Sequence, residues 1–494
     1  MTSRSFNSSV YKSSIAVSLS RICGLIRDVV VAAFFGASKV TDVFFVAFAI
    51  PNLFRAFFAE GALSSAFVPF LSDKFTKDRV SADKYLSDLI NIIFIITLSV
   101  YVIIFIFAKY IILLFMPGFY EDYNLINTGI GLLRILMLYL PFITVCGLLS
   151  GYLNVNRSYF VPHSSTVLLN ISMITGAIIG GIKGLNIYIL AWSVCLGGLL
   201  QLIYVAYFSS KIGYHYYINK NIDMDVKKTF HLVIPSIVGL SMNQLNFTVG
   251  RILASFLSAG SISYLYYANR LYQLPIGVFS VAAGVVSLTE LSIAASKSRQ
   301  KDRTEIIDNA ILVLILFVLP SFIGLFLLSK EIVELIYFRF NFTEESVIQT
   351  AKALKMYSLG LIFISLGNIL IRVFHSEKNL VTPVRVSFIC FVVNIVLNVI
   401  FMFFLGHAGI ALGSSVASAL NAVLLYRAIK NYSFSFIKYR FFIIKLLFST
   451  FIMVIALFIF KIFHINVLIN IILCVVIYLV MLKILKINIR EFAL

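Results

Sequence analysis

The chain has 494 residues, of which 61% are hydrophobic and 12% are charged, and its mean hydropathy is +1.00. Soluble domains are about half apolar and about a quarter charged, so this composition excludes a water-soluble core and is typical of a polytopic membrane protein. A net charge of +19 would suggest nucleic-acid binding in a soluble protein. Most Lys and Arg residues here lie in short loops between apolar segments, so membrane topology accounts for the charge and no nucleic-acid partner is expected.

The apolar segments, taken in chain order, predict an all-α fold. Segments of about 20 apolar residues can cross the hydrocarbon layer as helices, and about 14 are present. The expected spans are 13–35, 42–70 with a kink, 86–115, 128–154, 160–182, 186–208, 229–257, 263–294, 306–329, 348–374, 383–405, 408–429, 441–463 and 466–485. The polar stretch before the first span lacks a cleavage site, so we expect no removable signal peptide.

Basic residues are concentrated in every second loop between these spans. These loops contain Lys74, Lys77, Arg79 and Lys84; Lys211, Lys220, Lys227 and Lys228; Lys297, Arg299, Lys301 and Arg303; and Arg427, Lys430, Lys438 and Arg440. By the positive-inside rule these loops are cytoplasmic. The N-terminus lies on the same side of the membrane as these loops, and an even number of spans returns the C-terminus to that side. We therefore expect both termini in the cytoplasm.

The chain also repeats itself weakly. Three residues recur with identical spacing in the second half of the chain, Arg27, Gly36 and Pro51 as Arg251, Gly260 and Pro275. The repeat predicts two pseudo-symmetric six-helix lobes, 1–220 and 221–432, followed by two extra helices in 433–494. Two copies with the same orientation are typical of parallel-repeat transporters.

Among the arginines inside expected spans are Arg21, Arg27, Arg55 and Arg270. An arginine at mid-bilayer costs roughly 2.5 to 3.5 kcal/mol, so four arginines facing lipid would cost about 10 kcal/mol or more. We therefore expect these side chains to face a protected, hydrated interior. A cavity lined by fixed positive charge indicates a route for an anion.

The first span places polar residues on one broad side of its helix. Arg21, Gly24 and Asp28 share a face, and Ser20, Gly24 and Arg27 share the neighbouring stripe. Both stripes meet at Gly24, where another backbone could approach. Asp28 can partly neutralise the arginines, and an internal structural ion pair is the alternative interpretation.

The second span carries Asp42 near its outer end, then Asn52 and Arg55 about one turn apart, then Glu60. Pro51 precedes the Asn52 and Arg55 pair and could direct both side chains toward the cavity. Asp42 and Arg55 are roughly 20 Å apart along a helix, so they could mark opposite ends of a path, with Asp42 as a gate residue. Glu60 is either a cavity residue or an interfacial one.

In the eighth span, Asn269, Arg270 and Gln273 form a polar stripe just before Pro275. No carboxylate lies close by in sequence, so the cavity is expected to be cationic. Proline bends a membrane helix because it removes a backbone hydrogen bond. Pro51 and Pro275 occupy corresponding repeat positions and are the candidate hinges.

Neither enzyme chemistry nor a cofactor is indicated. The five cysteines are scattered singly and show no metal-ligand spacing, so we expect no metal site and no cofactor beyond a coupling ion or the membrane potential. Phosphate-binding loops, metalloprotease motifs and nucleophile elbows are not found. No loop is longer than about 20 residues, whereas membrane enzymes usually display acidic or histidine clusters on larger loops. A transporter is favoured over an enzyme.

Several segments resemble the MurJ (MviN) family of lipid II flippases, in the multidrug/oligosaccharidyl-lipid/polysaccharide (MOP) exporter superfamily. The longest is SRICGLIRDVVVAAFFGASKVTDVFFVAFAIPNLFRAFFAEGALSSAFVPFL, at Ser20–Leu71. Others are LLNIS at Leu168–Ser172, YYANRLYQLPIGV at Tyr266–Val278 and HAGIALG at His407–Gly413. Together they cover most of the chain, and the expected helix count agrees with the family.

The resemblance implies transport of lipid II, the undecaprenyl-pyrophosphate-linked disaccharide-pentapeptide, from the cytoplasmic to the periplasmic leaflet of the bacterial inner membrane. It also assigns cavity arginines and their acidic partners, which match Arg21, Arg27, Arg55 and Arg270, and Asp28 and Asp42. The last two helices would form a groove for the lipid tail. Membrane lipids and cell-wall synthesis proteins are the other expected partners, and a monomer is expected.

The sequence departs from the family pattern at two places. Asn269 and Gln273 stand where acidic residues are usual, and LTELS at Leu288–Ser292 replaces a proline-serine pair. Two alternatives stay open: a flippase for another polyprenyl-linked saccharide of the O-antigen type, and a non-transporting membrane scaffold for cell-wall synthesis. A multidrug cation exporter fits less well, because its cavity should be acidic.

Overall fold

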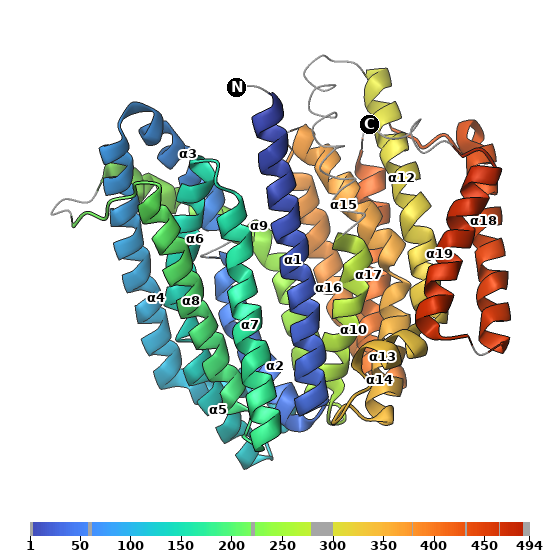
Figure 1. Cartoon of the computed structure of the whole chain (residues 1–494), viewed down its shortest axis with the longest axis horizontal. Coiled ribbons are helices and arrows are strands. Elements are labelled where there is room, and N and C mark those ends of the chain that lie inside the picture. Colours follow the sequence, from blue (N-terminus) through green and yellow to red (C-terminus); the bar gives the residue numbers. More distant parts are fainter. Residues whose placement is uncertain are drawn as a thin grey trace. The chain divides into compact units, whose positions relative to one another are not determined.

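In the computed structural model, residues 3–57, 62–218, 223–277, 300–377, 379–429, 432–463 and 465–487 are described, and their regular structure is helical without strands (Figure 1). The α-helices are α1 (Ser3–Phe35), α2 (Lys39–Arg55), α3 (Ala62–Lys77), α4 (Arg79–Phe115), α5 (Tyr123–Leu136), α6 (Tyr139–Val155), α7 (Phe160–Lys183), α8 (Tyr188–Lys211), α9 (Met224–Ala254), α10 (Ser261–Pro275), α12 (Gln300–Leu327), α13 (Ser329–Tyr337), α14 (Glu344–Ser358), α15 (Leu361–Ser376), α16 (Val381–Leu405), α17 (His407–Ala428), α18 (Phe436–Ile462) and α19 (Val467–Ile484). The predicted all-α fold is confirmed.

Three expected spans are divided into two helices each. The second span forms α2 and α3, the fourth forms α5 and α6, and the tenth forms α14 and α15, which are bent by 44°. Helix α13 lies where a loop was expected. Its buried residues, Ser329, Val333 and Tyr337, are spaced four apart and form one face, a pattern too short for detection by hydropathy.

Nine helical segments in the described ranges are long and apolar enough to cross a membrane, or ten if α14 and α15 count as one span. The count of 14 crossings stays a prediction. The four expected spans outside this set contain α1, α2 with α3, α9 and α10. These helices contain Arg21, Arg27, Arg55, Arg251 and Arg270, but arginines also lie in helices of the accepted set, such as Arg134 of α5 and Arg427 of α17. Helices α2, α3 and α10 have 17, 16 and 15 residues, fewer than the 18 required of a spanning helix here.

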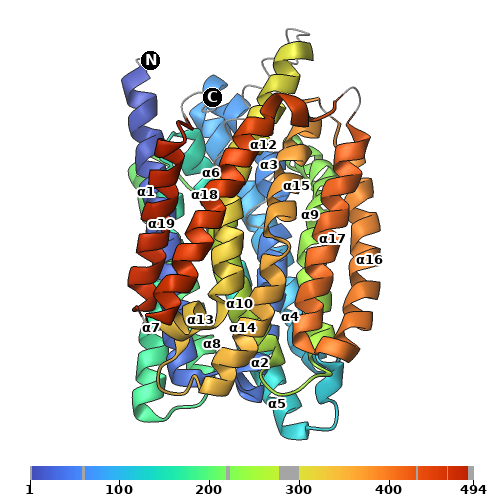
Figure 2. The same cartoon turned by 90° about the vertical axis from the view of Figure 1, so that its right-hand side faces the viewer.

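By packing, the chain divides into two compact units, residues 1–263 with 339–342 and residues 264–338 with 343–494. In the first unit α1 packs along α7, and α7 along α8 (Figure 1). In the second unit α16 packs along α17, and α18 along α19 (Figure 2). The predicted lobes 1–220 and 221–432 and the extra segment 433–494 rest on the sequence repeat and stay predictions.

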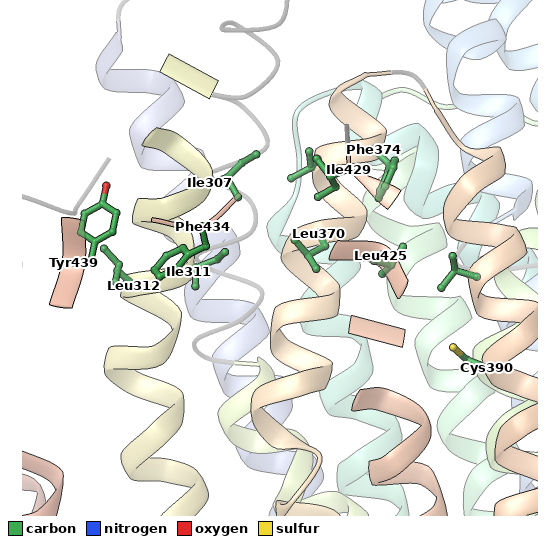
Figure 3. Packing of buried hydrophobic residues seen from close by; sticks show 12 residues of the cluster. Ile307, Ile311, Leu312, Leu370, Phe374, Cys390, Leu425, Ile429, Phe434 and Tyr439 are labelled. Carbon is green, nitrogen blue, oxygen red and sulfur yellow. The ribbon is translucent and has the colours of Figure 1, made fainter. Parts of the chain in front are cut away.

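The core of the second unit joins α12, α15 and α17 to the start of α18. Ile307 and Ile311 of α12, Phe374 of α15 and Leu425 of α17 belong to one buried apolar cluster, which also includes Tyr439 of α18 (Figure 3). Burial of such side chains contributes about 1.5–3 kcal/mol each. This cluster stabilises the packing of these four helices.

The last helix, α19, is joined to α12 by a buried hydrogen bond. The hydroxyl of Tyr478 on α19 donates to the carbonyl oxygen of Leu316 on α12 at 2.6 Å. On the outer faces of α18 and α19, large apolar residues are exposed, such as Phe441 at 64% and Ile484 at 62%. Exposed apolar faces are suited to contact with acyl chains, and the groove for a lipid tail stays a prediction.

The end of α1 is capped by a segment distant in sequence. Gly36 takes the left-handed conformation with φ of 64°, as is common just after a helix. Asn341 donates its backbone N–H to the carbonyl oxygen of Ala33 at 2.9 Å and its side-chain amide to that of Phe34 at 2.6 Å. Two carbonyls at the end of the helix are thereby satisfied.

Replacing Gly36 with alanine is expected to destabilise the protein more than replacing Gly184, which follows α7. Both glycines have a positive φ, and alanine costs about 1 kcal/mol there. A Cβ at Gly36 would lie 2.5 Å from the Asn341 carbonyl oxygen, whereas one at Gly184 meets nothing within 4 Å. The close contact adds roughly 1–3 kcal/mol to the loss of stability of the Gly36 variant. Thermal unfolding of both purified variants checks this, and equal losses of stability would contradict it.

Candidate substrate-binding site

Arg27 is buried in α1 and is held by two neighbours. Its Nε and Nη2 donate to Oδ1 of Asp28 at 3.0 and 2.8 Å, and its Nη1 donates to Oδ1 of Asn170 on α7 at 3.0 Å. Arg27 and Asp28 are 7% and 3% exposed. A buried charge is tolerated only when it is paired and hydrogen-bonded, so these contacts explain how Arg27 fits inside the helix bundle. The ion pair considered from sequence is present.

The polar stripe of α1 lies against α7. The Ser20 and Thr166 hydroxyls are 2.5 Å apart, and the side-chain amide of Asn170 donates to the carbonyl oxygen of Ser20 at 3.3 Å. A Cβ at Gly24 would lie 3.8 Å from Nδ2 of Asn170. The predicted approach of another helix at Gly24 therefore occurs, and α7 is that helix.

Asn170 is a site residue that the sequence interpretation missed. It lies in the LLNIS segment, in the middle of an otherwise apolar helix, and it is buried. A buried asparagine in a membrane helix needs hydrogen-bond partners, which is the signal that could have identified it. Arg21, one turn before Gly24, is exposed, unlike Arg27.

Arg55 is at the end of α2, where its neighbour fixes its orientation. The Nε of Arg55 donates to Oδ1 of Asn52 at 3.1 Å, and Nδ2 of Asn52 donates to the carbonyl oxygen of Phe48 at 2.8 Å. Both side chains are half-buried, and Pro51 beside them is buried. The pair expected from sequence is therefore formed. Glu60 lies outside the described residues.

Asp42 in the first turn of α2 is completely buried. Its Oδ2 accepts from the backbone N–H of Gly260 at 2.8 Å, and its Oδ1 accepts from the backbone N–H and the hydroxyl of Ser263 at 2.7 and 2.6 Å. All these residues belong to the first unit. Asp42 thus anchors the start of α2 to the segment Gly260–Ser263, and a gating role stays a prediction.

Arg270 lies on α10, in the second unit. Its Nη2 donates to the hydroxyl of Tyr266 at 3.0 Å, and its guanidinium carbon lies 5.0 Å from the centre of the Tyr266 ring. Asn269 is half-buried and Gln273 is exposed. Pro275 ends α10, and the next two residues form a π-helical turn, as do the two residues that follow Arg55 in α2. A common cavity for the four arginines stays a prediction.

Comparison with known proteins identifies relatives along most of the chain. The family described as "Lipid II flippase MurJ" matches residues 31–478, which include Arg55 and Arg270 but begin after Arg27. The "Probable lipid II flippase MurJ" of Buchnera aphidicola subsp. Schizaphis graminum (strain Sg) is 35% identical over 411 residues, or 83% of this chain and 80% of that protein.

Solved structures agree with this assignment. "Lipid II flippase MurJ, inward closed conformation" has a TM-score of 0.84 and 31% identity, and the match covers 96% of this chain and 98% of that chain. An inward-facing multidrug resistance MATE family transporter of the MOP superfamily has a TM-score of 0.67 at 14% identity, covering 85% of this chain and 96% of that chain, and shows the shared fold alone. The chain is a multi-pass membrane protein and belongs to the lipid II flippase MurJ family.

Proposed function

We propose that the protein moves lipid II from the cytoplasmic to the periplasmic leaflet of the bacterial inner membrane. Family membership supports this substrate, since the relatives are named lipid II flippases. The observation that carries the proposal is that Arg27, Arg55 and Arg270 lie in membrane-protein helices with their side chains held by Asn170, Asn52 and Tyr266. Arginine side chains that are fixed by such hydrogen bonds are suited to bind an anion that must cross a bilayer.

The chemistry of the head group fits these side chains. A pyrophosphate carries two or more negative charges, and the planar donor fork of arginine binds phosphate oxygens with two parallel hydrogen bonds. Asn52 fixes the guanidinium plane of Arg55 through its Nε, and Tyr266 restrains Arg270. The polar head would pass along the arginines, while the polyprenyl tail stays in lipid. Side chains held in advance lose less entropy on binding.

Alternating access is the transport cycle that we infer. Pro51 lies one turn before the end of α2 and Pro275 ends α10, near Arg55 and Arg270, and the two residues after each helix are π-helical. Proline and π-turns weaken the backbone ladder locally, so both helices can bend there. Asp42, with its three accepted hydrogen bonds, would close the outer end of the path. We expect no enzymatic turnover of the lipid, and we expect both termini in the cytoplasm.

Complementation tests this function. A bacterium depleted of its own lipid II flippase is expected to grow when the chain is expressed, and to fail when Arg55→Ala is expressed at the same level. The matched control is Arg385→Leu, which removes an exposed arginine near the start of α16 and should support growth. If the chain restores O-antigen export but not growth, a flippase for another saccharide replaces this proposal. Growth with Arg55→Ala would instead favour the scaffold.

A further inference from the structure

Two of the divided spans are interrupted at corresponding places, one in each compact unit. Helix α5 is followed by α6, and α14 by α15, after two turn residues in each case. At the first break the N–H of Leu138 donates to the carbonyl oxygen of Ile135 at 3.0 Å, and at the second the N–H of Gly360 donates to that of Tyr357 at 3.0 Å. The second pair stands 222 positions after the first. The breaks therefore follow the sequence repeat.

A cation stands in the last helical turn before each break and lies over an aromatic ring. The guanidinium carbon of Arg134 on α5 lies 4.6 Å from the centre of the Phe105 ring of α4, and its Nε donates to the Phe105 carbonyl oxygen at 3.1 Å. The Nζ of Lys355 on α14 lies 4.8 Å from the centre of the Phe326 ring of α12. Both members of this second pair stand 221 positions after their counterparts. We call each pair of cation and ring a clamp.

Each clamp holds the point at which the backbone of the first half-helix ends. The last carbonyls of a helix carry roughly half a negative elementary charge, which attracts a cation in the last turn. The contact of the cation with the ring contributes about 0.5–2 kcal/mol. A clamp of this strength favours one position of the half-helix but is weak enough to break and form again.

A neighbouring helix donates a side-chain hydrogen bond to a carbonyl at each break. The Sγ of Cys195 on α8 donates to the carbonyl oxygen of Ile135 at 3.0 Å, and the hydroxyl of Ser415 on α17 donates to that of Met356 at 2.7 Å. Backbone groups inside a bilayer need hydrogen-bond partners within the protein. Because side chains supply these bonds, the carbonyls keep a partner where the helix is interrupted.

The two breaks differ in their bend. Helices α14 and α15 are bent by 44°, whereas α5 and α6 run together as one span of 33 residues. The same arrangement of turn, clamp and side-chain donor is thus compatible with more than one angle. A structure that keeps its hydrogen bonds at different angles has the property that a hinge requires.

We propose that the two breaks are hinges and that Arg134 and Lys355 are positioning residues, each of which sets the angle between its half-helices by clamping on its ring. The inference rests on the proposed transport by alternating access, in which helices change their bend between two states. It adds a pair of hinges to the two prolines already described. Each clamp lies within one compact unit, so the two hinges can be tested separately.

Hydrogen exchange of the full chain in neutral detergent tests the clamps without any substrate. Arg134→Met is expected to speed amide exchange about fivefold in peptide 133–141 only, and Lys355→Met to do so in peptide 355–363 only, because each break loses its own clamp. The matched control is Lys352→Met, which removes an exposed lysine one turn earlier on α14 and should change neither peptide. Exchange that stays at the wild-type rate in both clamp variants, or that rises in both peptides at once, overturns the clamps.

Binding and transport assays distinguish a hinge from a substrate site. The double variant Arg134→Met/Lys355→Met should bind lipid II with a Kd within about twofold of the wild type but move it between leaflets roughly tenfold more slowly, because the clamps set an angle and touch no substrate. Transport at the wild-type rate overturns the hinge role. A loss of lipid II binding in parallel with transport overturns it as well, since the two cations would then belong to the substrate site.

Two conservative variants keep the test decisive if a methionine variant does not fold. Arg134→Lys keeps a cation over Phe105 and should exchange nearly as slowly as the wild type. Phe326→Leu keeps Lys355 but removes its ring, so it should exchange as fast as Lys355→Met is expected to, and wild-type exchange in this variant overturns the clamp. If the wild type moves no lipid II, the proposed function fails, and the exchange pattern supports or overturns the clamps by itself.

Discussion

Replacing Arg27 with alanine is expected to abolish lipid II transport and also to destabilise the protein. The substitution leaves Asp28 buried without its guanidinium partner, and an unpaired buried charge costs roughly 3–5 kcal/mol. It also removes a donor fork for pyrophosphate, for which a loss of about a hundredfold in transport is expected. Transport is measured as leaflet exposure of labelled lipid II, and stability as Tm.

The double variant Arg27→Ala/Asp28→Asn separates these two effects. It removes both members of the ion pair, so much of the lost stability should return while transport stays absent. Arg27→Lys should transport weakly, because a single ammonium group cannot reproduce the fork that reaches both Asp28 and Asn170. Transport by the double variant at the wild-type rate would show that Arg27 has only a structural role.

Replacing Asp42 with alanine is expected to have the second-largest effect, mainly on stability. Two backbone N–H groups and one hydroxyl, from Gly260 and Ser263, would lose their acceptor in a completely buried place. An unsatisfied buried donor costs about 1–3 kcal/mol, so a loss of roughly 3 kcal/mol or more is expected. Thermal unfolding of the purified variant measures it.

Two milder substitutions calibrate the Asp42 result. Ser263→Ala removes one of the three hydrogen bonds and should cost about 1 kcal/mol. Asp42→Asn keeps one acceptor oxygen but turns an N–H toward a donor. Its loss of stability should therefore lie between the losses of Ser263→Ala and Asp42→Ala. If Asp42→Ala is no more destabilising than Ser263→Ala, the anchor between α2 and the segment Gly260–Ser263 is not important for stability.

Hydropathy predicted the fold well because a bilayer allows few alternatives. Lipid provides no hydrogen bonds, so a long apolar segment has to be helical, and every expected span coincides with helix where it is described. The breaks within spans were harder to predict. The interruption between α5 and α6 has no sequence signal beyond Pro141, and α13 is amphipathic and only nine residues long.

For the candidate site, only contacts between residues that are close in sequence were predicted. Contacts within one helix follow from the sequence, through i, i+3 spacing for Asn52 with Arg55 and through adjacency for Arg27 with Asp28. Contacts between distant segments do not. The partner of Asp42, Ser263, comes from far along the chain, and spacing gives no information about it.

Arg134 was missed for a different reason. Its immediate sequence neighbours, Leu133 and Ile135, are apolar, and no carboxylate stands three or four positions away on either side. Only the packing of α5 on α4 shows that the guanidinium group of Arg134 lies over the Phe105 ring. A charge outside a polar cluster is therefore the kind of feature that a sequence pattern cannot place.

Leaflet exposure of lipid II in proteoliposomes tests the central claim most directly. Fluorescent lipid II is placed in both leaflets, and a membrane-impermeant quencher reports how much reaches the outer one over time. With the wild-type chain, quenching should proceed beyond half of the signal, whereas liposomes containing Arg27→Ala/Asp28→Asn should stop near half. Equal quenching by the wild type, the double variant and protein-free liposomes would contradict the proposal that these arginines carry a pyrophosphate lipid across the membrane.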